Sequence, residues 1–207
     1  MKIIQSPLLA SQYYRTAYAK KQIVLHGTNS DSSPKNIISY WHSNPAKIGA
    51  AFIIDRDGTI YQTFESHYWI HHIGIRGKDF LSLDQYSIAI TMCCVGGLNE
   101  EKGQFFNMHN SIIDASEVID YGKNFRGYRY FQKYTSEQLD SLKELLLKLC
   151  HSFYIPTQIT TEKWDVSLKA LDGKPGIYTN VNFRQDVSDC HPQPELIQML
   201  MSIESSL

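Results

Sequence analysis

The chain has 207 residues, of which 43% are hydrophobic and 20% are charged, and its formal net charge is −1. These values are ordinary for a globular protein, and without a polybasic face they give no support for a nucleic-acid partner. A chain of this length most simply forms one domain, and no segment approaches the roughly 20 apolar residues that span a bilayer.

Two features of the sequence bear on where the protein works. Residues 1–7 lack the long apolar core and the cleavage site of a signal peptide, so we expect synthesis in the cytoplasm without a signal peptide, and exit, if any, by lysis or a dedicated machine. The cysteines are Cys93, Cys94, Cys150 and Cys190, and they form no CxxC pair. We expect reduced thiols rather than disulfides.

The first half of the chain is expected to be mostly strands. The predicted elements are a strand at 22–26, a helix at 34–43, a hairpin of strands at 51–54 and 59–64, and a strand at 87–94. Ser33 can cap the helix, and Pro34 suits its first position. Asp57-Gly58 favours the hairpin turn because this pair tolerates positive φ.

The second half opens with a polar, aromatic excursion and ends in helices. The predicted elements are an excursion over 98–134 with one short helix near 109–120, a helix after Thr135, a strand at 177–182 and a helix at 194–205. Thr135 and Gln138 form a capping box, followed by an apolar stripe of Leu139, Leu142, Leu146 and Leu149. Helices interleaved with strands around an apolar sheet indicate an α/β fold with functional groups at strand ends.

The strand that begins at Gln22 ends in the imidazole of His26. A turn of small polar residues, Gly27-Thr28-Asn29, follows it directly. A histidine in this position is well placed to hold a metal ion or to transfer a proton.

A series of motifs shares its order and spacing with a known family. The series is the strand ending in His26, Tyr40-Trp41-His42, the segment 48–61, His72-Ile73-Gly74 and Ser87-Ile88-Ala89-Ile90. It resembles the type 2 N-acetylmuramoyl-L-alanine amidases, which include T7-type phage lysozymes and are related to peptidoglycan recognition proteins. The resemblance implies one amidase-like domain over 1–207, with a core at about 20–205 and a central mixed β-sheet flanked by helices. It does not explain residues 98–134.

The resemblance also implies a reaction and a cofactor. Such amidases hydrolyse the amide between N-acetylmuramic acid and the L-alanine of the stem peptide. They bind one Zn²⁺ through two histidines and a third Cys, Asp or His, and zinc suits this chemistry because an open position activates water. The implied partners are peptidoglycan or muropeptides, with no nucleic acid and no membrane span, and the implied place of action is the cell wall after release or dedicated export.

The resemblance assigns metal ligands with one clear departure. His26 matches the first ligand. The last ligand lies within 186–192, where His191 is favoured because Pro192 follows it, Cys190 is an alternative, and Asp189 ranks last. The position of the second histidine holds Asn180, whose amide oxygen is a weaker zinc ligand. Either the site binds zinc weakly, or another histidine takes this place, or the change removes zinc and silences the enzyme.

Other positions of the family pattern also differ. Thr91 occupies the catalytic place of a common strand glutamate, Ala50 and Ala51 are inert where polar groups are frequent, and Ser188 replaces a lysine. The chain therefore lacks an obvious carboxylate base.

Several side chains remain as candidates for chemistry or binding. His72 is the best candidate for proton transfer or substrate contact. Trp69, with Tyr68, could stack on sugar faces, and Arg184 could pair with a stem-peptide carboxylate. Two functions follow: a zinc-dependent peptidoglycan amidase that Asn180 could impair, or a catalytically inactive amidase fold that binds muropeptides or a protein partner.

Overall fold

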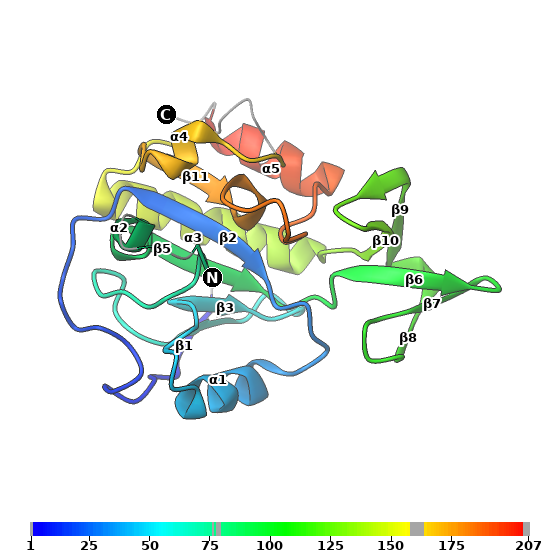
Figure 1. Ribbon diagram of the computed structural model, residues 1–207, viewed down its shortest axis with the longest axis horizontal. Coiled ribbons are helices and arrows are strands. Elements are labelled where there is room, and N and C mark those ends of the chain that lie inside the picture. Colours follow the sequence, from blue (N-terminus) through cyan, green and yellow to red (C-terminus); the bar gives the residue numbers. More distant parts are fainter. Residues whose placement is uncertain (1, 76, 78–79, 158–163, 205–207) are drawn as a thin grey trace.

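Two β-sheets organise the chain in this computed structural model, which describes residues 2–75, 77, 80–157 and 164–204. The main sheet has the strand order β1-β4-β3-β5-β2-β11 (Figure 1). Its strands are β1 (Ile3–Gln5), β2 (Gln22–Gly27), β3 (Phe52–Ile54), β4 (Ile60–Gln62), β5 (Ser87–Met92) and β11 (Gly176–Thr179). Only β3 and β4 pair antiparallel, so the predicted mixed sheet is confirmed.

The β3–β4 hairpin forms where Asp57-Gly58 predicted it. Gly58 has a φ of 80°, and the Asp57 carboxylate accepts a hydrogen bond from the Thr59 amide at 2.8 Å. A side chain at position 58 would also meet the backbone of Glu137 on α3. Glycine is therefore required both by the positive φ and by this close approach.

Three longer helices cover the main sheet. They are α1 (Pro34–Ser43), α3 (Ser136–Phe153) and α5 (Pro194–Glu204), and two short helices, α2 (Leu81–Gln85) and α4 (Leu168–Leu171), lie at its margins. The capping box is confirmed, since the Thr135 hydroxyl accepts from the Gln138 amide and the Gln138 side chain accepts from the Thr135 amide, each at 3.1 Å. Residue 205, the expected end of α5, lies outside the described residues.

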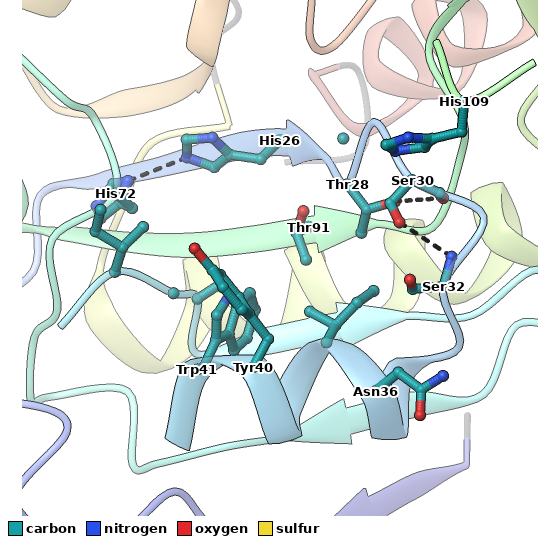
Figure 2. A pocket seen from close by; sticks show the side chains of 15 residues that line it. His26, Thr28, Ser30, Ser32, Asn36, Tyr40, Trp41, His72, Thr91 and His109 are labelled. Carbon is teal, nitrogen blue, oxygen red and sulfur yellow. Dashed lines mark hydrogen bonds between the residues drawn. The ribbon is translucent and has the colours of Figure 1, made fainter. Parts of the chain in front are cut away.

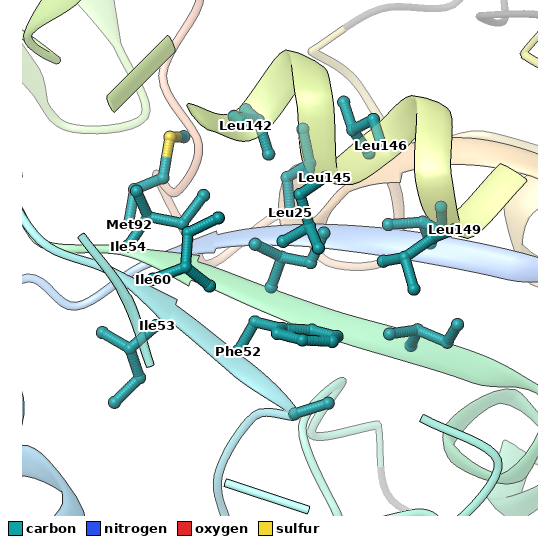
Figure 3. Packing of buried hydrophobic residues seen from close by; sticks show 14 of the residues in the cluster. Leu25, Phe52, Ile53, Ile54, Ile60, Met92, Leu142, Leu145, Leu146 and Leu149 are labelled. Carbon is teal, nitrogen blue, oxygen red and sulfur yellow. The ribbon is translucent and has the colours of Figure 1, made fainter. Parts of the chain in front are cut away.

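The core lies between the main sheet and α3. Leu142, Leu145 and Leu146 are almost fully buried and face strand residues that include Leu25 and Phe52 (Figure 3). Burial of apolar area on this scale is the main stabilising term of the fold. It also holds the carboxyl ends of β2 and β5 in a fixed position.

The excursion at 98–134 is a second sheet, not a loop with a helix. Its strands are β6 (Gly97–Glu101), β7 (Gln104–Phe106), β8 (Ile112–Ile113), β9 (Val118–Phe125) and β10 (Tyr128–Gln132), in the order β8-β7-β6-β10-β9. The predicted helix near 109–120 is wrong, because only the 3-10 turn η2 (Ala115–Glu117) forms there. Short antiparallel strands need one half-buried face only, so a polar segment can form them.

The second sheet begins where β5 ends and projects from that side of the main sheet (Figure 1). The Tyr128 ring lies directly over Gly97, so closely that a side chain at residue 97 would overlap it. The amide of Val95 also donates to the Gln132 side chain at 2.9 Å. These contacts place the second sheet beside the carboxyl ends of β2 and β5.

Three further expectations can be compared with the structure. The predicted strand at 177–182 is shorter, since Asn180–Asn182 form the 3-10 turn η3. The four cysteines are buried and free of disulfides, as expected. Among the described residues, none of the helices combines the length and apolar character needed to cross a membrane.

Candidate active site

A cavity of about 740 Å³ opens at the carboxyl ends of β2 and β5 (Figure 2). Its lining residues are His26, Gly27, Thr28, Ser30, Ser32, Asn36, Ile37, Tyr40, Trp41, Ile48, Gly49, Ala50, His72, Thr91 and His109. The turn after β2 supplies the small polar groups, and α1 supplies the aromatic ones. A cavity at this edge of the sheet is the usual location of an α/β ligand site.

The second sheet forms one side of the cavity through His109. His109 lies in the loop between β7 and β8, and Figure 2 shows it above Ser30. The loop is tied to the turn after β2, because Asn107 and Ser111 both donate to the Asp31 carboxylate, at 3.4 and 3.2 Å. No pattern in the sequence signalled this contact, since it depends on the second sheet.

His26 lies beside Thr91 in the parallel pairing of β2 with β5. Its Nε2 atom is 3.0 Å from Nδ1 of His72, and its Nδ1 atom is 3.5 Å from the Asp189 carboxylate. The two nitrogens of one imidazole therefore contact two residues that lie far from it, and from each other, in the sequence. Because the side chain of His26 is only 10% exposed, these contacts fix the ring.

Asp189 and Asn180 complete the cluster next to His26. The Asn180 amide nitrogen donates to both Asp189 carboxylate oxygens at 3.2 Å, and the Gly27 amide donates to the same carboxylate at 3.2 Å. Burial favours a raised pKa for Asp189, but the hydrogen bonds and charge of His26 and the bonds from Gly27 and Asn180 outweigh it and lower the pKa. Asp189 is thus a buried carboxylate.

A second buried carboxylate, Asp84, supports His72 from behind. Asp84 accepts from the backbone amides of His72 and Ile73, at 3.1 and 3.0 Å, and lies 2.9 Å from Nδ1 of His71. Burial, which Asp84 only partly offsets, lowers the pKa of His72 to about 3. His72 is therefore a neutral imidazole at the end of the cavity.

A family model described as N-acetylmuramoyl-L-alanine amidase matches residues 17–174. The chain belongs to this family. The match covers His26, His72 and Thr91 and ends before Asn180 and Asp189, so the positions of the latter two rest on the structure. None of the curated proteins matches the chain in sequence.

Solved structures of amidases share the fold. The structure of PlyL has a TM-score of 0.59 and 11% identity, with 100% of this chain and 99% of PlyL covered. The N-acetylmuramoyl-L-alanine amidase LysC from Clostridium intestinale URNW has a TM-score of 0.54 and 15% identity, with 98% of this chain and 96% of LysC covered. The catalytic domain of XlyA has a TM-score of 0.52 and 15% identity, with 99% and 98% covered. At these identities the likeness shows the fold alone.

His191, the favoured third ligand, lies apart from the cavity in this amidase fold. Its ring stacks between Phe131 and Tyr134, Nδ1 bonds the Tyr121 hydroxyl at 2.7 Å, and Nε2 bonds the Gln132 carbonyl at 3.0 Å. Both nitrogens are therefore engaged in packing the second sheet. The structure places Asp189, ranked last from the sequence, next to His26 instead.

Cys190, the alternative ligand, is fully buried in the main core. Burial is the largest of the effects that raise the pKa of its thiol far above the ordinary value. Cys190 is not among the residues that line the cavity.

The residues expected to contact sugar and peptide, Trp69 and Arg184, have the following surroundings. Trp69 is buried and stacks on Tyr14 with 3.9 Å between ring centroids, and it does not line the cavity. Arg184 forms a two-point ion pair with Asp186. The aromatic residues that do line the cavity are Tyr40 and Trp41 on α1. Their position just before His42 in the family motif was the available sequence signal.

The donor set around His26 does not fit the zinc site of the family. In the part of the chain that the structure describes, no three His, Cys, Asp or Glu side chains gather as a metal site. His26 and Asp189 are strong donors, but Asn180 turns its NH₂ group to the carboxylate. An amide adds a neutral, weak oxygen where zinc prefers nitrogen or sulfur.

Proposed function

We propose that the cavity binds the muramyl–L-alanine junction of peptidoglycan and that the hydrolysis typical of the family is impaired in this chain. The cluster of His26, Asp189 and Asn180 carries this proposal. His26 and Asp189 contact each other where the resemblance expects metal ligands, and Asn180 adds an amide where the resemblance expects a second imidazole. Zinc in a complete site would acidify a water molecule and polarise the scissile carbonyl.

The cavity lining suits a sugar joined to a short peptide. Tyr40 is 63% exposed at the cavity rim, and an exposed aromatic face can stack on a sugar ring. The hydroxyl of Ser30 and the amide of Asn36 offer hydrogen bonds to sugar and peptide polar groups. Binding therefore needs no metal ion.

The cavity lacks the carboxylate that commonly serves as the general base in this family, because Thr91 stands at that position. Thr91 faces the cavity beside His26, where it can offer only a hydroxyl. A hydroxyl is a poor general base near neutral pH, so Thr91 adds a hydrogen bond rather than a base. His72 is neutral and could accept a proton, but its ring nitrogens already contact His26 and Ser87.

The proposed partner is peptidoglycan or a muropeptide released from it, encountered at the cell wall after release or dedicated export. Binding is tested by calorimetry with N-acetylmuramyl-L-alanyl-D-isoglutamine, and the sugar-free dipeptide serves as a control. We expect saturable binding of the muramyl peptide and weaker binding of the control. Absence of binding at millimolar ligand would contradict the proposal.

The matched variant is Tyr40→Ala, which removes an exposed ring and leaves the His26 cluster intact. An aromatic contact is worth about 0.5–1.5 kcal/mol, so we expect roughly 2- to 10-fold weaker binding. An unchanged affinity would remove Tyr40 from the binding surface. In parallel, muropeptide release from purified sacculi should stay at background for the parent chain with added zinc.

A further inference from the structure

A second cavity, of about 280 Å³, lies where the second sheet meets the segment 186–189. Gly97, Met108 and Tyr128 line it from the second sheet and its loops, and Asp186 and Asp189 line it from the facing segment. The second sheet lies outside the motifs that carry the family resemblance. This cavity is therefore built by a part of the chain that those motifs leave without a role.

The second cavity adjoins the first, which opens at the carboxyl ends of β2 and β5. Gly27 and Thr28 line the first cavity, and the next residue, Asn29, lines the second. The loop between β7 and β8 borders both in the same way, since His109 lines the first cavity and Met108 lines the second. An extended ligand that leaves the first cavity over this turn would therefore reach the second.

The walls of the second cavity are tied together by Arg126, which lies in the turn between β9 and β10. Arg126 donates to the Gln185 carbonyl at 2.7 Å and to the Asp165 carboxylate at 2.9 Å. Its side chain is only 15% exposed, so the guanidinium is held against these two partners. The cavity is therefore preformed, and an anionic ligand would find this positive charge already paired.

The charge around the second cavity is negative on balance. Two guanidinium groups and three carboxylates form its ion pairs and lining, those of Arg126, Arg184, Asp165, Asp186 and Asp189. Asp189 is buried, whereas the side chain of Asp186 is 69% exposed. Arg184 binds the Asp186 carboxylate at two points, but a carboxylate has about four lone-pair sites and accepts further N–H donors. An ammonium group can therefore bind Asp186 from the cavity.

The apolar part of the lining suits a hydrocarbon chain. Val95, Tyr128 and Val187 contribute to it, and Met108 is 64% exposed beside them. A methionine side chain is unbranched and polarizable, so it adapts to an aliphatic chain. Cavities that hold a whole drug-sized ligand measure roughly 300–1,000 Å³. The smaller second cavity suits one residue of a longer ligand.

We propose that the second cavity binds a later residue of the stem peptide, one whose aliphatic side chain ends in an ammonium group. Met108 packs against the aliphatic chain, and Asp186 binds the ammonium group. The muramyl–L-alanine junction lies in the first cavity, so this inference rests on the proposed function. It gives the second sheet a role in selecting the peptide.

The test compares two ligands by calorimetry on the parent chain. N-acetylmuramyl-L-alanyl-D-isoglutamine lacks the later residue, and its extension by L-lysine supplies an aliphatic ammonium. We expect the lysine ligand to bind about 5- to 20-fold more tightly, through part of one aliphatic chain and one exposed ion pair. Equal affinities would overturn this inference and leave the proposed function in place. Absence of binding by both ligands would remove both.

A norleucine ligand separates the ammonium group from the aliphatic chain. Norleucine in place of lysine keeps the chain without the charge, so it should bind roughly 2- to 5-fold more weakly than lysine. Asp186→Asn should abolish this difference and leave the affinity for the shorter ligand at the parent value. A preference for lysine that persists in Asp186→Asn would overturn the role of Asp186.

A matched control variant separates a local contact from a general effect of charge. Asp120 forms a comparable two-point ion pair with Arg129 on the second sheet, with both bonds at 2.7 Å, and it does not line the second cavity. Asp120→Asn should leave the preference for lysine over norleucine unchanged. An equal loss of this preference in the control would contradict the proposal.

Discussion

The two histidines on which the sequence pattern concentrated, His26 and His191, are both buried, but their surroundings differ. His191 stacks between two aromatic rings, with a hydroxyl and a carbonyl on its two nitrogens. His26 faces a cavity, with an imidazole on one nitrogen and a carboxylate on the other. A buried imidazole is structural when neutral groups satisfy it and functional when charge and open space remain beside it.

The largest expected effect on stability comes from removing each of the two imidazole rings in turn. His191→Ala should lower the free energy of unfolding by about 3–5 kcal/mol, because it leaves a cavity between Phe131 and Tyr134 and removes the partner of the Gln132 carbonyl and of the Tyr121 hydroxyl. Chemical denaturation measures this loss. His26→Ala, next to open space, should cost roughly 1–2 kcal/mol. Equal losses would contradict the assignment of separate roles.

The pH dependence of the free energy of unfolding tests the structural role of His191. Burial lowers its pKa to about 3, so between about pH 6.5 and pH 3 the unfolded chain binds a proton that the folded chain does not. Stability should therefore fall as the pH falls through this window. His191→Gln should reduce the slope by about 1.4 kcal/mol per pH unit. An unchanged slope in urea titrations from about pH 6.5 to about pH 4 would show that His191 does not supply it.

The smallest expected effect is at the hydroxyl on His191. Its Nε2 must donate to the Gln132 carbonyl, so Nδ1 accepts from the Tyr121 hydroxyl. Tyr121→Phe should cost about 1 kcal/mol, the net worth of one hydrogen bond, while muramyl peptide affinity stays at the parent value. Loss of that affinity would show that His191 influences the cavity, and the two histidines would then not have separate roles.

The main fold could be predicted because local signals agreed with it. The Thr135 capping box, the Asp57-Gly58 turn and the apolar strand ending in His26 each depend on neighbouring residues. The second sheet was missed because its pairings join polar segments whose half-buried face exists only after folding. Its turn at Arg126-Gly127, with both φ angles positive, was the local signal available.

The third member of the His26 cluster could not be read from the sequence. Asp189, Cys190 and His191 are adjacent, and the proline at residue 192 favoured His191. Which side chain meets His26 depends on the direction in which this loop approaches β2. That direction is set by contacts of His191 with Phe131 on β10 and with Tyr134, which follows β10 in the chain. Those contacts rest on strands that the sequence did not reveal.

Zinc titration of the parent chain and of Asn180→His, followed by calorimetry, tests most directly whether Asn180 is what impairs the site. We expect no stoichiometric zinc in the parent, and one zinc per chain in the variant with an affinity higher by orders of magnitude, because a second imidazole joins His26 and Asp189. Tight, stoichiometric zinc binding by the parent would contradict it. So would a variant that binds no more zinc than the parent.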